Sequence, residues 1–360
     1  MKSFERMGRR TTFLLVMGAL GACDIPTDIP KLEQEWILPL SETSVEVGEF
    51  LPADVGLTED SSAFTVQVDP IFFQEKLGDL CAACGALDGL TVPKPAFVGD
   101  FHESVYLPDD VESAQVQEGR ISVEARNLFG FDPLRPKGGE TGSVTLALHD
   151  GGPAGPVLDE VVIDGGEASF APGTSIEREL EYSGPVGSSL SVTVSVNSPA
   201  GGLEPGNWVP IRTDDEIRVS VTPEVLEAAS AEISVAGEVF NLGVTSLDVA
   251  EIRKDLVDQI TAGSFILEIV NPWSVGAILS LTIDGPTMAA PVVLIGQVPA
   301  SPTSTVELEL SQAEIQSILG ETGVVMTGQG TASQDAGTVT IAPAQVMIID
   351  AKLDLVLLIG

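Results

Sequence analysis

Cysteine is the residue type in this 360-residue chain whose spacing most directly suggests chemistry. Cys81 and Cys84 are separated by two alanines, a spacing found in redox-active dithiols, haem attachment sites, zinc sites and short disulfides. Haem attachment requires a histidine after the second cysteine, where Gly85 stands. Structural zinc requires four ligands, and the chain can add only His102 and His149. We therefore expect a local structural disulfide, with redox activity as the alternative.

The third cysteine, Cys23, ends a segment built like a secretion signal. Residues 1–10 are basic, and residues 11–20 are an uncharged run that suits a signal peptide and is too short for a membrane-spanning helix. The run ends in Leu20-Gly21-Ala22-Cys23. This resembles the lipobox of bacterial lipoproteins, an aliphatic residue and two small residues before the acylated cysteine. The resemblance implies that residues 1–22 are removed and that Cys23 is lipidated in a Gram-negative cell envelope. An ordinary secretory signal with a chance cysteine is the alternative.

The lipid would hold the protein at the membrane, with residues 23–40 as a tether. Each buried methylene contributes about 0.8 kcal/mol, so two or three acyl chains anchor stably. Pro26, Pro30 and Pro39 favour an extended segment. In enteric bacteria an aspartate after the lipidated position, here Asp24, retains lipoproteins at the inner membrane. This rule does not transfer between phyla, so we assign no membrane leaflet.

The acidic charge of the chain limits the classes of partner that it can bind. Removal of residues 1–22 leaves 52 acidic and 13 basic residues. Such a surface repels nucleic acid and anionic lipid head groups. We expect no nucleic-acid partner and membrane contact only through the lipid anchor. The calcium-binding pattern D-x-[DN]-x-[DN]-G is absent from the sequence, and we expect neither a metal nor a cofactor.

The sequence contains no recognisable catalytic motif. It has no G-x-S-x-G elbow, phosphate-binding loop, dinucleotide fingerprint or H-E-x-x-H motif. We expect His102 and His149 on the surface, and the many acids single out no pair. We therefore expect a protein that is not an enzyme, with a carboxylate-based envelope hydrolase as one alternative.

The body of the chain has the pattern of antiparallel sheets. Aliphatic and small polar residues alternate in residues 143–148, 190–196 and 278–283, as in a sheet with one face on the core and one in water. We expect a mainly β fold of two tandem antiparallel β-sandwich-like repeats, residues 111–240 and 241–360. A mixed N-terminal region, residues 41–110, and a few short helices complete it.

Internal similarity supports two repeats. Three segment pairs recur in the same order: 121–127 and 265–271, 172–180 and 302–310, 219–223 and 339–343. Asn271-Pro272 after an alternating strand is weakly similar to the late-embryogenesis-abundant type of β-sandwich, in which strands commonly end in Asn-Pro.

Three helices are expected. Thr245 and Asp248 form a capping-box pair before a linking helix over residues 247–261. Ser311 and Glu314 form a second pair, and residues 70–80 have a helical pattern that ends at Cys81.

Two loops are candidate binding surfaces, because function often lies on loops held by a rigid sandwich. One places Phe129 and Phe131 beside Arg135 and Lys137, and the other contains Trp208. The alternative is that these aromatic side chains cap the core. We expect a lipoprotein with a structural or binding role and an envelope protein or lipophilic ligand as partner. A carrier with a lipid cavity between its sheets is the further alternative.

Overall fold

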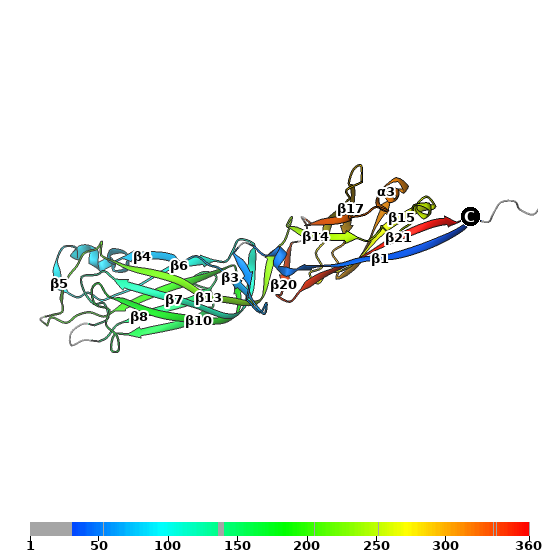
Figure 1. Ribbon diagram of the computed structural model, residues 1–360. Coiled ribbons are helices and arrows are strands. Elements are labelled where there is room, and N and C mark those ends of the chain that lie inside the picture. Colours follow the sequence, from blue (N-terminus) through cyan, green and yellow to red (C-terminus); the bar gives the residue numbers. More distant parts are fainter. Residues whose placement is uncertain are drawn as a thin grey trace, which may run out of the picture.

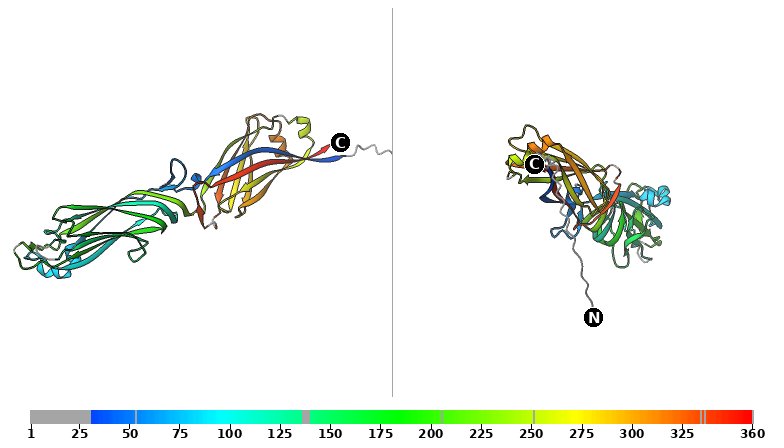
Figure 2. Two further views of the ribbon diagram at one scale, coloured as in Figure 1. Left: turned by 90° about the horizontal axis from the view of Figure 1, so that it is seen from below. Right: turned by 90° about the vertical axis from the view of Figure 1, so that its right-hand side faces the viewer.

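The computed structural model describes residues 31–52, 54–135, 140–204, 206–250, 252–333, 335 and 337–359. The expected signal peptide, residues 23–30 of the expected tether, which include Cys23, and Lys137 lie outside these residues. Two β-sandwiches lie end to end and give an elongated molecule (Figures 1 and 2). Every strand pairing is antiparallel among the described residues, so the predicted mainly β fold is confirmed.

The sandwich nearer the C-terminus is called the host sandwich and contains residues 32–46 and 239–359. Its two four-stranded sheets have the orders β1-β21-β15-β18 and β14-β19-β16-β17. The strands are β1 Leu32–Glu46, β14 Val239–Leu247, β15 Ile260–Val270, β16 Ala277–Asp284, β17 Val292–Val298, β18 Thr303–Leu310, β19 Val324–Ala332, β20 Thr338–Ile341 and β21 Val346–Ile359. The short helices are α2 Lys254–Val257 and α3 Gln312–Ile318.

The other sandwich is called the inserted sandwich and contains residues 55–235. One sheet runs β10-β7-β13-β3-β2, with β4 also on β13, and the other runs β6-β11-β8-β9. The strands are β2 Val55–Leu57, β3 Phe64–Val66, β4 Ile71–Lys76, β5 Thr91–Pro93, β6 Phe97–Tyr106, β7 Val111–Asn127, β8 Ser143–Asp150, β9 Val157–Asp164, β10 Ser175–Gly187, β11 Ser189–Ser198, β12 Trp208–Pro210 and β13 Glu216–Ser234. Its helical turns are α1 Leu77–Leu80 and η2 Ala82–Leu87, and a further turn, η1 Val47–Phe50, follows β1 before the inserted sandwich begins.

The two units are nested rather than tandem. Strand β1 pairs along its length with β21, from Leu32 opposite Ile359 to Glu46 opposite Val346. The chain therefore contributes one strand to the host sandwich, builds the whole inserted sandwich, and returns at β14. The predicted tether is wrong from Leu32 onward. Pro39 suggested an extended linker, but it lies on an edge strand beside a register shift, where proline is tolerated.

The two sandwiches nevertheless share one strand order. The sheet β6-β11-β8-β9 corresponds to β14-β19-β16-β17, and β10-β7-β13-β4 corresponds to β18-β15-β21-β1. The first two segment pairs from the sequence fall on corresponding strands, β7 with β15 and β10 with β18. The third does not, because β20 pairs with the end of β13 instead of occupying its place. An origin by duplication stays a prediction.

The helix predictions had mixed outcomes. The capping box of Ser311 and Glu314 is present and begins α3. The expected linking helix over residues 247–261 is wrong, because only α2 is helical there and β14 and β15 flank it. The expected helix over residues 70–80 is also wrong before Leu77, since β4 pairs there with β13. Both patterns have short apolar spacings that a strand with one buried face can also satisfy.

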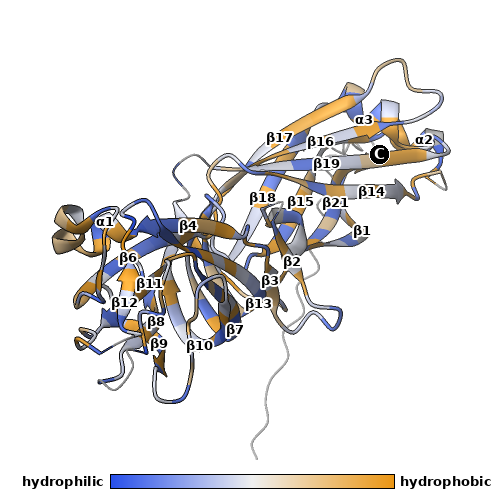
Figure 3. Ribbon diagram, turned by 90° about the vertical axis from the view of Figure 1, so that its left-hand side faces the viewer, coloured by the Kyte–Doolittle hydropathy of each residue, from blue (hydrophilic) through white to orange (hydrophobic). Residues whose placement is uncertain are grey.

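The two sandwiches join through a packed junction. Strand β20 of the host sandwich pairs with the last residues of β13. Val235, Phe240, Trp273 and Ile341 line an apolar space of only about 10 Å³ there, so this junction is closely packed. Within each sandwich, hydrophobic and hydrophilic residues alternate along the strands (Figure 3). No helix in the described parts of the chain is long and apolar enough to cross a membrane.

Candidate functional site

The sequence-predicted site residues that the structure describes gather at one end of the molecule. This end, called the distal tip, is the end of the inserted sandwich farthest from the host sandwich (Figure 1). It is formed by residues 77–95, 128–135, 164–171, 199–204 and 206–215. Segments that are far apart in sequence therefore meet at one place.

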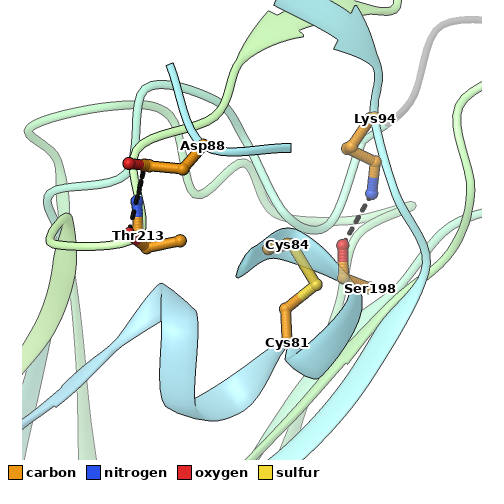
Figure 4. Close-up of a disulfide and its surroundings, with 6 residues drawn as sticks. All are labelled: Cys81, Cys84, Asp88, Lys94, Ser198 and Thr213. Carbon is orange, nitrogen blue, oxygen red and sulfur yellow. Dashed lines mark hydrogen bonds between the residues drawn. A yellow bond between two sulfur atoms is a disulfide. The ribbon is translucent and has the colours of Figure 1, made fainter. Parts of the chain in front are cut away.

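Cys81 and Cys84 form a disulfide at this tip, between α1 and η2 (Figure 4). Both cysteines are buried, with 2% and 0% exposure. A Cβ on Gly99 of β6 would lie 2.6 Å from the side chain of Leu80, so the disulfide turn packs tightly on the sheet. Thiol exchange needs an accessible sulfur, and this packing favours the structural interpretation over the redox one.

Lys94 is a site residue that the sequence analysis missed. Its side chain is 3% exposed, and Nζ donates to the carbonyl of Pro133 and to Oγ of Ser198, both at 2.8 Å. Burial lowers the pKa of Lys94 to about 8, although Asp132 nearby acts in the opposite direction. No sequence motif marks this lysine, because its partners come from β11 and from the loop after β7 (Figure 4).

Asn127 organises the loop that carries Phe129 and Phe131. Its Oδ1 accepts from the backbone of Phe129 at 2.8 Å, and its Nδ2 donates to the carbonyls of Phe131 and Phe170. The two phenylalanine side chains are 1% and 4% exposed and stack with centroids 5.7 Å apart. Phe129 also makes an edge contact with Phe97. The prediction that these aromatic rings form a binding surface is therefore wrong, because they fill the end of the core.

Arg135 and Asp132 hold the same loop to a neighbouring turn. Arg135 donates to the carbonyls of Gly165 and Gly166. Asp132 accepts from the hydroxyl of Ser169 at 2.8 Å and from the backbone of Phe170 at 3.0 Å. These bonds give Arg135 a structural role, while its guanidinium remains at the surface.

Trp208 is the predicted aromatic binding residue that the structure leaves accessible. It begins β12, which pairs with β5 so that Trp208 lies opposite Pro93. Its exposure is 52%, and Leu90 and Leu203 at the same tip are 52% and 82% exposed. Trp208, Leu90 and Leu203 are therefore three large apolar side chains of the distal tip that solvent can reach.

The two histidines lie on the sheet β6-β11-β8-β9. His102 on β6 is exposed, as expected. His149 on β8 is only 9% exposed, and its Nδ1 lies 3.1 Å from the carbonyl oxygen of Gly155, so its predicted surface position is wrong. On the intervening strand β11, Thr193 lies opposite His102 and Ser191 lies opposite His149. No cluster of three or more potential metal ligands occurs among the described residues.

Comparison with known proteins identifies no family. No family model and no curated protein matches the chain. The chain is similar to a presumed secreted protein of Parabacteroides distasonis, with 10% identity over 89% of this chain and 99% of that one, at a TM-score of 0.32. A second similarity is to infectious bursal disease virus, Gx strain, with 9% identity over 92% and 73% at a TM-score of 0.21.

A third similarity is to a glycosyl hydrolase family 2 member of Bacteroides cellulosilyticus. It has 12% identity over 86% of this chain and 36% of that one, at a TM-score of 0.20. All three scores are too low to support a functional argument. The function must therefore be argued from the chain itself.

Proposed function

We propose that this protein is a cell-envelope lipoprotein without catalytic activity. In this proposal Cys23 carries the lipid and the distal tip presents a contact surface to an envelope partner. The host sandwich lies next to the membrane, and the inserted sandwich is displayed beyond it.

The position of β1, the first described strand, is the main support for this orientation. Leu32 begins β1 at the free end of the host sandwich, directly beside Ile359 near the C-terminus (Figures 1 and 2). The proposed acylated residue is only nine positions earlier in the sequence. The exposed Trp208 lies at the opposite end of the molecule. A lipid near residue 23 would therefore leave the distal tip as the part farthest from the bilayer.

The anchor is tested by changing Cys23→Ala. The unchanged chain is expected in the detergent phase after phase separation, with an intact mass that fits cleavage before Cys23 and added acyl groups. The variant is expected in the aqueous phase or as an uncleaved precursor. An unacylated thiol at position 23, or cleavage elsewhere, would refute the lipoprotein assignment.

The contact surface is tested by placing a photo-crosslinking residue at position 208 in cells. Position 106 is the matched control, because Tyr106 is 71% exposed at the other end of β6. We expect a discrete adduct from position 208 that is absent from position 106. Identical patterns, or no adduct at either position, would show that the tip is not a contact surface.

The two alternative functions receive less support. A lipid carrier needs a cavity of several hundred Å³, whereas the apolar space at the junction is about 10 Å³. A carboxylate hydrolase needs an acid whose pKa is raised by burial. Asp54 and Asp69 border an open hollow of about 350 Å³, but both are exposed. These observations favour a binding role over both alternatives.

A further inference from the structure

One face of the host sandwich differs in charge from the rest of the molecule. The sheet β14-β19-β16-β17 has only one charged residue in its four fully described strands, Asp284 at the end of β16. The whole chain contains 53 acidic and 17 basic residues. A four-stranded sheet with a single charge is therefore exceptional in this protein.

The outward side chains of this sheet form three neutral rows across the strands. Their register places Val244, Thr327, Thr282 and Val293 in one row, Asn241, Gln329, Ser280 and Ile295 in the second, and Val239, Thr331, Ile278 and Gln297 in the third. Val244 and Ile295 are 72% and 69% exposed, and Val293 is 52% exposed. Exposed valine and isoleucine side chains lie on both edge strands, and Ile278 lies between them on β16 among threonine, serine and glutamine side chains.

The corresponding face of the inserted sandwich has charges at matching places. The edge strands β17 and β9 can be aligned on one buried residue each, Val298 opposite Ala277 and Ile163 opposite Val144. Three residues before the aligned position, on the outer face, β17 has Ile295 and β9 has Glu160. Where the inserted sandwich has an exposed carboxylate, the host sandwich therefore has an exposed isoleucine. Edge strand β9 contains Asp159, Glu160 and Asp164, whereas β17 contains no charge.

We propose that this neutral face, the outer side of β14, β19, β16 and β17, binds the same face of a second copy of this chain. Two copies of such an acidic protein repel each other, and contact through this face removes carboxylates from the interface. A flat face of this composition is compatible with itself across a twofold axis. Pro291 and Pro299 flank β17, which disfavours extension of strand pairing from its edge and favours face-to-face contact.

A membrane surface fits this face less well than a second copy. Interfacial membrane-binding surfaces combine aromatic side chains with lysine or arginine. The three rows contain neither kind of residue. Their valine, isoleucine and threonine side chains are those that pack between sheets.

The size and direction of the face predict a weak, side-by-side dimer. From ordinary strand spacings, the face measures about 450 Å² per copy, less than the roughly 800 Å² per partner of a stable soluble complex. The strands run along the long axis of the molecule (Figure 1), so two parallel copies have their N-terminal ends on the same side. On the proposed function, both lipids then enter one membrane, and this confinement raises the effective concentration.

Cysteine crosslinking of the processed full chain in phosphatidylcholine vesicles tests the dimer. Ser280→Cys places a thiol at the centre of the face, and Val162→Cys is the control on the inserted sandwich, where Val162 is 57% exposed. A short thiol crosslinker is expected to yield dimers from Ser280→Cys at least tenfold faster than from Val162→Cys. Adding Ile295→Glu should reduce the yield at least tenfold, whereas adding Val162→Glu should leave it unchanged.

Equal crosslinking from both positions, or no effect of Ile295→Glu, would overturn the proposal. Vesicle flotation reports the lipid anchor separately. If the protein does not float, the same variants are compared in solution at millimolar concentration, where the dimer should still form from Ser280→Cys. A failed anchor and a failed dimer are thus distinguished. Circular dichroism confirms that each variant is folded.

Discussion

The host and inserted sandwiches share one strand order, but the inserted sandwich is elaborated at its loop end and the host sandwich on one sheet face. Both use a buried asparagine at the end of a central strand. Asn127 ends β7 and bonds the backbone two and four residues later, and Asn271 follows β15 and does the same with Trp273 and Val275. Within the described parts of both units, only the inserted sandwich adds a disulfide, a buried lysine and an exposed tryptophan at its end.

The shared features are therefore ones that the strand order requires, whereas the added features depend on where each sandwich lies in the molecule. The shared asparagine lies where each sandwich must turn a strand into a loop without leaving polar backbone groups unpaired. The added features lie on loops that the other sandwich does not cover. The host sandwich instead has a neutral face that the inserted sandwich lacks. A single strand order thus supports a specialised tip in one unit and a specialised face in the other.

The largest effect is expected from breaking the nested connection. A fragment of residues 239–359 lacks β1, which covers β21 over its whole length, and should fail to fold. Because Leu32 lies opposite Ile359, joining residue 359 to residue 32 through a short flexible linker should restore a folded host sandwich that ends at residue 46. Circular dichroism and urea unfolding measure this. A folded fragment without β1 would show that the first strand is dispensable.

The shared asparagines come next. Asn127→Ala should lower the free energy of unfolding of the inserted sandwich by about 4 kcal/mol, because buried backbone groups lose their partners. Asn271→Ala should lower that of the host sandwich by about 3 kcal/mol, since it makes fewer bonds. Trp208 fluorescence reports one sandwich and Trp273 the other, each in a variant with the remaining tryptophans replaced. Asn197→Ala, at an exposed position, is the control. Equal, small losses in all three would contradict the shared role.

Because of Lys94, the free energy of unfolding of the inserted sandwich should depend on pH in a way that the host sandwich does not show. The pKa is near 10.4 in an unfolded chain and about 8 in the folded protein. Between these values the unfolded state binds more protons, so stability should rise with pH. Relative to Lys94→Met, the wild-type chain should gain up to about 3 kcal/mol from pH 8 to pH 10.5. Urea unfolding with Trp208 as the probe measures this. A pH-independent difference would refute the desolvated lysine.

The disulfide should have the smallest effect of the four. It closes a loop of only four residues, Cys81 to Cys84, and loop entropy predicts about 2 kcal/mol from such a short closure. The double change Cys81→Ala and Cys84→Ala should therefore destabilise the inserted sandwich by about that amount and leave the Trp273 transition unchanged. A shift of both transitions would show that the tip and the junction are coupled.

Much of the fold could be predicted from single segments. Alternation along residues 143–148 and 278–283 predicted strands, and Ser311 with Glu314 predicted the start of α3, because these signals depend only on neighbours in sequence. The binding loops were less predictable. Phe129 and Phe131 beside Arg135 looked like an exposed surface, but the hydrogen bonds of Asn127 turn both rings into the core.

By itself, the sequence determined the β character, the acidic surface, the pairing of Cys81 with Cys84 as an option, and a candidate lipid site at Cys23. Local composition and spacing are sufficient for such properties. Only the tertiary structure decided that residues 32–46 belong with residues 239–359, that Lys94 is buried, and that the neutral rows of the host sandwich form one face. These depend on contacts between segments that are separate in sequence, such as the pairing of β1 with β21. The free energy of such contacts comes from packing that no single segment contains.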